Sequence, residues 1–117
     1  AWSGTYLVAA NPGRRRIETW SAGGKMISAS GEPGTAPGAF CGCCNPSHIA
    51  IIPDGIVTAE KGINRIKILN HDGSFVEFVS SHNSFDQSVP LDLATDDGTR
   101  IYAADNSDSK LYIFERK

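Results

Sequence analysis

The chain has 117 residues, of which 40% are hydrophobic, 21% charged and 9% aromatic, and its formal net charge is −2. This composition is typical of a globular domain and excludes a disordered or fibrous chain. No apolar run approaches the roughly 20 residues that a membrane-spanning helix needs. Eleven basic residues stand against thirteen acidic ones, so the overall charge offers no field that would gather nucleic acid, and we expect none as a partner.

The sequence contains an internal repeat with three copies. The stretch 7–20 aligns without a gap on 56–69 at an offset of 49 residues, and a third copy at 101–114 follows at an offset of 45. Several short apolar runs fall within each period, a spacing typical of four-stranded antiparallel units. Helix signals are nearly absent, because 12 Gly and 6 Pro residues interrupt the long stretches. The sequence therefore predicts an all-β fold.

The three predicted units follow one another along the chain. The first spans 5–31 and is expected to hold only strands 2 to 4, since six residues precede Leu7. The second spans 38–81 and is complete, and the third spans 88–117 and holds strands 1 to 3. The four strands of the second unit are predicted at 49–52, 56–60, 65–69 and 75–79.

Charged residues recur at fixed places in the repeat. Arg65 and Lys67 alternate with apolar residues, which predicts a half-buried third strand. Glu60 is expected to pair with Arg65 across the hairpin. Asp105 and Lys110 stand at the equivalent positions of the third copy, so we expect the same pairing there.

The middle copy resembles the NHL repeat. The residues that carry this resemblance are Gly38-Ala39-Phe40, Pro46, Ile49-Ala50-Ile51, Asp54-Gly55, Val57, Glu60, Asn64-Arg65-Ile66, Ile68 and Asp72-Gly73-Ser74-Phe75. The flanking copies match less fully, with Arg15 at the Asn position of the first copy and Ser109-Lys110 in place of Asn-Arg in the third. NHL repeats build six-bladed β-propellers, so the resemblance implies that the units are blades. It specifies a fold far more than an activity.

Three, four and three strands make about two and a half blades, an incomplete ring that would expose apolar surface between blades. Three arrangements are open. The chain begins at Ala1 without a Met or a signal segment, which favours a removed leader or a piece of a longer polypeptide whose further blades complete the propeller. Two or more chains could instead complete the ring as a homo-oligomer, or the fold could be a compact β structure of another kind.

The most unusual local chemistry is the segment Cys41-Gly42-Cys43-Cys44. Cysteines this close in sequence bridge only with strained geometry, and their odd number leaves one over. Such thiolates can share one soft metal, for which copper, zinc and an iron–sulfur cluster are the candidates. We expect Cys41, Cys43 and Cys44 as metal ligands, with His48 or a second chain completing the site.

Two further roles for the cysteines stay open. They could pack structurally in the tight turn that leads into a blade, or form a disulfide with another chain. The stretch Gly42-Cys43-Cys44-Asn45-Pro46 is similar to a feature of a bacterial subgroup of NHL-repeat proteins. That similarity does not say what the cysteines do.

Two classes of function follow. In the first, the propeller is a binding, interaction or carrier module for a protein partner, with a soft metal held at the cysteines. In the second, it is part of a metal-dependent propeller enzyme, a lyase or hydrolase. For this enzyme class His48 and Asp92, at equivalent positions two residues after Pro46 and Pro90, are candidate ligands on the channel axis. Reduced cysteines would suit the cytosol, whereas propeller architecture and a removed leader favour the periplasm.

Overall fold

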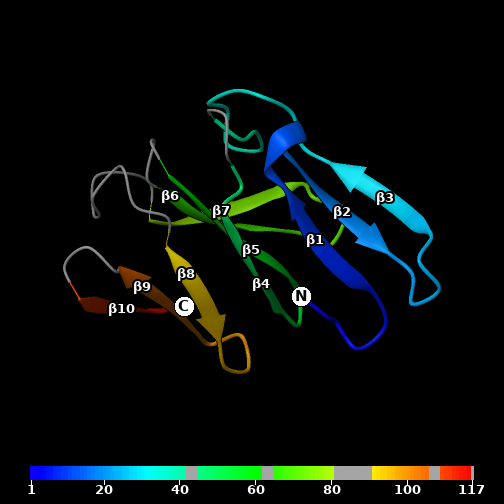
Figure 1. Ribbon diagram of the computed structural model, residues 1–117. Helices are drawn as coiled ribbons and strands as arrows, with labels where there is room; N and C mark the ends of the chain where they lie inside the picture. The colour runs from blue at the N-terminus through cyan, green and yellow to red at the C-terminus, as the bar shows by residue number, and fades with distance from the viewer. Residues whose placement is uncertain (42–44, 62–64, 81–90, 106–108, 117) are drawn as a thin grey trace.

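The computed structural model describes residues 1–41, 45–61, 65–80, 91–105 and 109–116 (Figure 1). The first sheet contains β1 (Leu7–Asn11), β2 (Arg16–Trp20) and β3 (Met26–Ser30), with the short 3-10 helix η1 (Pro12–Arg14) between β1 and β2. The middle sheet contains β4 (His48–Ile52), β5 (Gly55–Glu60), β6 (Arg65–Leu69) and β7 (Phe75–Ser80). The third contains β8 (Asp92–Thr95), β9 (Arg100–Asp105) and β10 (Lys110–Glu115). The predicted all-β class is confirmed.

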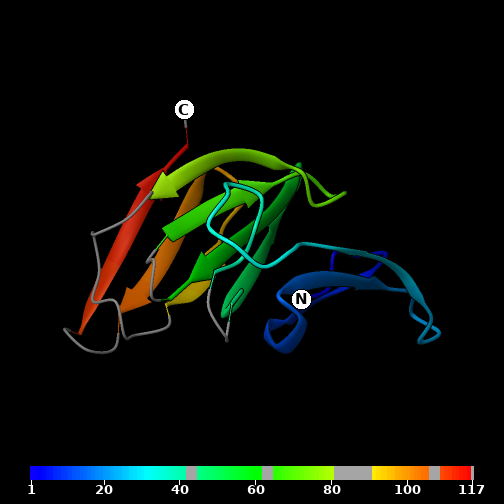
Figure 2. The same ribbon diagram turned by 90° about the horizontal axis from the view of Figure 1, so that it is seen from above.

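Each sheet is an antiparallel meander in which every strand pairs with its neighbour in sequence, and the sheet orders are β1-β2-β3, β4-β5-β6-β7 and β10-β9-β8. The predicted strands of the middle unit are confirmed to within one residue at either end. The three sheets stand in a row with the middle sheet between the first and the third, and within the described residues they do not close into a ring (Figure 2). Their identity as propeller blades therefore stays a prediction. In the described part of the chain, no helix is long and apolar enough to cross a membrane.

The first sheet has three strands, as predicted, but the start of the chain adds to it. Trp2 forms an isolated antiparallel bridge with Leu7. The Val8 N–H donates to the Ala1 carbonyl at 2.7 Å, and the Ala1 ammonium donates to the Val8 carbonyl at 2.6 Å. The first two residues thus lie beside β1, on the side where β4 lies beside β5 in the middle sheet.

The core consists of two apolar layers, one between each pair of adjacent sheets. Because successive side chains of a strand point to opposite faces, the middle sheet contributes to both layers. The layer toward the first sheet contains Val8, Ile17, Phe40, Ile56 and Leu69. The layer toward the third sheet contains Ala50, Ile52, Val57, Ala59, Ile66, Ile68, Leu91, Ile101 and Ala103.

Turn glycines and polar contacts fix how closely the sheets approach. Gly73, in the β6–β7 turn, has a φ of +90°, and a Cβ there would collide with the Ser30 Oγ of β3. On the other side, the Thr95 hydroxyl donates to the Ile51 carbonyl at 3.0 Å, which links β8 to β4. The Arg116 guanidinium donates to the Asp54 carboxylate at 2.9 Å and so ties the end of the third sheet to the β4–β5 turn.

Candidate functional site

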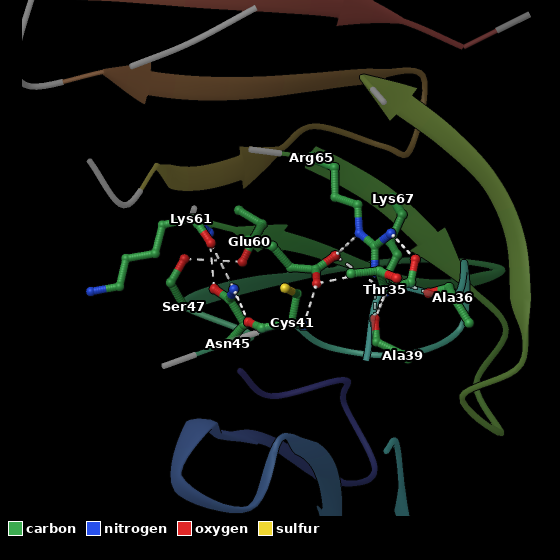
Figure 3. Close-up of polar contacts among 11 residues, drawn as sticks. Thr35, Ala36, Ala39, Cys41, Asn45, Ser47, Glu60, Lys61, Arg65 and Lys67 are labelled. Carbon is green, nitrogen blue, oxygen red and sulfur yellow. Dashed lines mark hydrogen bonds and ion pairs between the residues drawn. The ribbon is translucent and has the colours of Figure 1, made fainter. Parts of the chain in front are cut away.

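The cysteine segment lies where the connection from β3 enters the middle sheet. Cys41 is half-buried with a free thiol, and its backbone N–H donates to Glu60 Oε1 at 3.2 Å (Figure 3). Cys43 and Cys44, the remaining two predicted thiolate ligands, lie outside the described residues. The structure therefore describes the two ends of this segment, at Cys41 and Asn45.

Asn45 joins the two ends of the cysteine segment to each other and to Lys61, which follows β5. Its side chain is buried, and its Nδ2 donates to the carbonyls of Cys41 at 2.5 Å and of Lys61 at 2.8 Å. Its Oδ1 accepts from the Lys61 N–H at 2.9 Å. Ser47 continues the attachment, since its hydroxyl donates to the Ala59 carbonyl at 3.0 Å. Both ends of the cysteine segment are thus held against the end of β5 by hydrogen bonds (Figure 3).

A cluster of buried charged side chains lies next to the cysteine segment and contacts it through Glu60. Glu60, Arg65 and Lys67 are 1%, 3% and 0% exposed, and Glu60 stands opposite Arg65 in the β5–β6 register. Glu60 Oε2 accepts from Arg65 Nε at 2.5 Å and lies 3.2 Å from Lys67 Nζ. The predicted Glu60–Arg65 pair is confirmed. The prediction of a half-buried third strand is wrong, because all five residues of β6 are buried.

The connection from β3 explains this burial, because its carbonyls cover the two cations. The Arg65 guanidinium donates to the carbonyls of Thr35 at 2.9 Å, Ala36 at 3.0 Å and Ala39 at 2.7 Å. The Lys67 ammonium donates to the Ala39 carbonyl as well. One carboxylate cannot neutralise two cations, so these carbonyl oxygens provide the remaining hydrogen-bond acceptors that buried charges require.

The cluster also shifts the protonation of its lysine. The pKa of Lys67 is lowered to about 8, because burial and, to a smaller extent, the neighbouring Arg65 charge lower it by more than Glu60 raises it. The ammonium also lies 4.3 Å from the centre of the Phe40 ring. The Lys67 amine faces a backbone carbonyl and the Glu60 carboxylate, and these contacts give it a structural role.

His48 and Asp92 lie at the starts of β4 and β8, which are edge strands of the middle and third sheets. The structure brings them together, with His48 Nε2 4.0 Å from Asp92 Oδ1. The side chains are 37% and 75% exposed, and the buried His48 Nδ1 has no hydrogen-bond partner among the residues that the structure describes. Their equivalent positions in the repeat could be read from the sequence, and the structure adds that the sheets bring them within reach of one ligand.

No described group of three His, Cys, Asp or Glu side chains could hold a metal ion by itself. The predicted set of Cys41, Cys43, Cys44 and His48 depends on two residues outside the described chain, so it stays a prediction. Asp105 and Lys110 of the third copy stand opposite each other in the β9–β10 register, and pairing of their side chains stays a prediction.

A separate cleft opens between the first and middle sheets at the far ends of β4 and β6. Its volume is about 760 Å³, and apolar side chains such as Val8, Ile27 and Ile51 line it, with Trp2 and Tyr6 among the lining residues. Of the predicted site residues that the structure describes, Cys41, His48 and Asp92 do not line this cleft.

Comparison with known proteins adds no assignment to this geometry. No family model matches the chain, and no curated protein matches it. The resemblance to the NHL repeat therefore stays a prediction that rests on the residues themselves.

Proposed function

We propose that the protein is a binding or carrier module of NHL-like blades that holds a soft metal ion or cluster through Cys41, Cys43 and Cys44. The observation that supports this most is that hydrogen bonds hold both ends of the cysteine segment in place. Asn45 ties Cys41 to Lys61, and the Cys41 N–H is fixed on the buried Glu60. A loop whose ends are already ordered loses less conformational entropy when it binds a ligand, and so binds more tightly.

Thiolates are the ligands that Cu(I), zinc and iron–sulfur clusters prefer, which gives the chemical class of the cargo. His48 is the nearest imidazole in sequence, three residues after Asn45, and it supplies a nitrogen ligand where a fourth is needed. In this function the module presents the metal to a partner and needs no turnover.

Metal analysis of the protein, purified without oxygen and supplied with Cu(I), Zn²⁺ or Fe²⁺ with sulfide, tests the proposal. We expect a stoichiometric amount of one metal, lost when Cys43→Ser and Cys44→Ser are combined. Asn45→Ala should weaken binding by about 10- to 100-fold, as loss of a residue that supports ligands does. Asn70→Ala is the matched control, because Asn70 hydrogen-bonds Ser74 in an exposed turn at the other end of β6. Wild-type protein that takes up none of these metals contradicts the proposal.

A metal-dependent propeller enzyme is the second candidate, and the pairing of His48 with Asp92 favours it. In that case the metal is held by imidazole and carboxylate ligands and polarises a substrate or activates water. The same metal measurement separates the two candidates. His48→Ala with Asp92→Asn should abolish metal binding in an enzyme of this kind, while the double cysteine variant should keep its metal.

A further inference from the structure

Equivalent residues of the three repeats face the same way in their sheets, which lets one interface serve as a template for another. In the middle sheet, Ile66 and Ile68 belong to the layer toward the third sheet. Ile56 and Leu69 belong to the layer toward the first sheet. Every sheet therefore has a forward face, directed along the row from the first sheet toward the third, and a backward face, directed the opposite way.

The forward face of the third sheet is uncovered. Leu111 and Ile113 stand 45 residues after Ile66 and Ile68 in the repeat. Ile66 and Ile68 are 0% and 1% exposed, whereas Leu111 and Ile113 are 61% and 56% exposed. Two large apolar side chains thus point to solvent at the positions that, one sheet earlier, fill a core.

The backward face of the first sheet is uncovered in the same way. Leu7 and Trp20, which pair across β1 and β2, stand 49 residues before Ile56 and Leu69. Leu7 is 45% exposed, whereas Ile56 and Leu69 are each 1% exposed. A hollow of about 570 Å³ lies on this face and is lined by Trp2, Leu7, Ala9, Trp20, Ser21, Ala22 and Gly24.

The contact between the middle and third sheets shows how two such faces fit. There Ile66 and Ile68 form one cluster with Ile101, and Phe114 packs against that cluster. Ile101 and Phe114 are the third-sheet equivalents of Leu7 and Trp20, 94 residues later in the repeat. The face with Leu111 and Ile113 is therefore equivalent to the face with Ile66 and Ile68. The face with Leu7 and Trp20 is equivalent to the face with Ile101 and Phe114, which packs on Ile66 and Ile68.

The charges on the first sheet do not oppose such a contact. Glu18, on the same face as Leu7 and Trp20, accepts from Asn11 Nδ2 at 2.9 Å, from Arg16 Nε at 2.8 Å and from Trp20 Nε1 at 3.2 Å. Its carboxylate is already paired, so covering this face leaves no unpaired buried charge.

We propose that a second copy of this chain covers these faces, with Leu111 and Ile113 of one protomer packed on Leu7 and Trp20 of the next. The contact is head to tail and joins two different surfaces, so repetition gives a ring if the rotation closes and an open stack if it does not. The inference rests on the sheet faces alone and does not need the proposed metal site.

Sedimentation with a reductant and a chelator tests this, because neither disulfides nor shared metal ions can then join chains. We expect the wild-type chain to sediment as an oligomer, either of one defined mass or growing with concentration. Leu7→Glu and Leu111→Glu should each sediment as a monomer with unchanged far-UV circular dichroism. Their equimolar mixture should form a dimer, because each variant keeps the one face that the other lacks.

Val76→Glu is the matched control, since Val76 is 42% exposed on the middle sheet and belongs to neither face; this variant should associate as the wild type does. If Leu7→Glu unfolds, Ala9→Glu on the same hollow replaces it. A wild-type chain that stays monomeric overturns the proposal and leaves the two faces to different segments or partners. Single variants that associate like the wild type, or a mixture that stays monomeric, overturn it as well.

Discussion

Three charged side chains in the interior decide how the chain enters the middle sheet. Glu60 bridges Arg65 and Lys67, and both cations donate to carbonyls of the connection that leads from β3 to Cys41. Isolated buried charges are costly, and partners that satisfy every donor offset that cost. The cluster therefore acts as a fixed anchor for a segment without regular secondary structure.

Glu60→Gln should destabilise the fold strongly. The substitution leaves two buried cations with only neutral acceptors, and breaking a buried pair of this kind costs about 3–5 kcal/mol. Urea unfolding followed by circular dichroism measures the change. Glu77→Gln is the control, because Glu77 is 53% exposed and its ion pair with Arg116 lies at the surface. A loss for Glu60→Gln no larger than that of the control would show that the cluster does not anchor the connection.

Lys67 makes stability depend on pH in a defined direction. Burial lowers its pKa in the folded protein from 10.5 to about 8, so between these values the unfolded chain binds more protons than the folded one. The free energy of unfolding should then rise as the pH increases from about 8 toward 10.5. In Lys67→Met this contribution is absent, so the difference between the pH profiles of the two proteins isolates the contribution of Lys67. Parallel pH profiles for the two proteins would contradict the lowered pKa.

At the scale of the elements, the sequence predicted strands better than it predicted what covers them. Short apolar runs between Asp-Gly turns were enough to place β4 to β7 to within one residue, because strand length and turn chemistry are local properties. The burial of Lys67 could not be predicted in that way. It depends on contacts with Ala39, 28 positions away in the sequence, and with Phe40. No periodic pattern in the sequence indicates which backbone carbonyl a side chain reaches.

In the candidate site, too, the sequence predicted local features but not the contacts between distant segments. The cysteine cluster was evident from the sequence, and the equivalence of His48 and Asp92 followed from the repeat. The role of Asn45 was missed, since an Asn before a Pro ordinarily indicates a turn. Its three hydrogen bonds to Cys41 and Lys61 join two segments that only the fold brings together.

For the molecule as a whole, the central claim is that three successive repeats form three sheets in a row with the same faces in the same order. The repeat offsets predicted the units, and the structure adds their packing, with Ile66 and Ile68 toward the third sheet and Ile56 and Leu69 toward the first. A slip of one residue in any strand would exchange these faces, because side chains alternate along a strand. The head-to-tail proposal depends on this arrangement.

Nuclear Overhauser contacts between isoleucine methyl groups in the folded protein test that arrangement most directly. The structure predicts contacts that link Ile66 and Ile68 with Ile101, and separate contacts that link Ile17 with Ile56. Contacts of Ile56 with Ile101, together with the absence of any between Ile66 or Ile68 and Ile101, would mean that the sheet faces are reversed and would contradict the account.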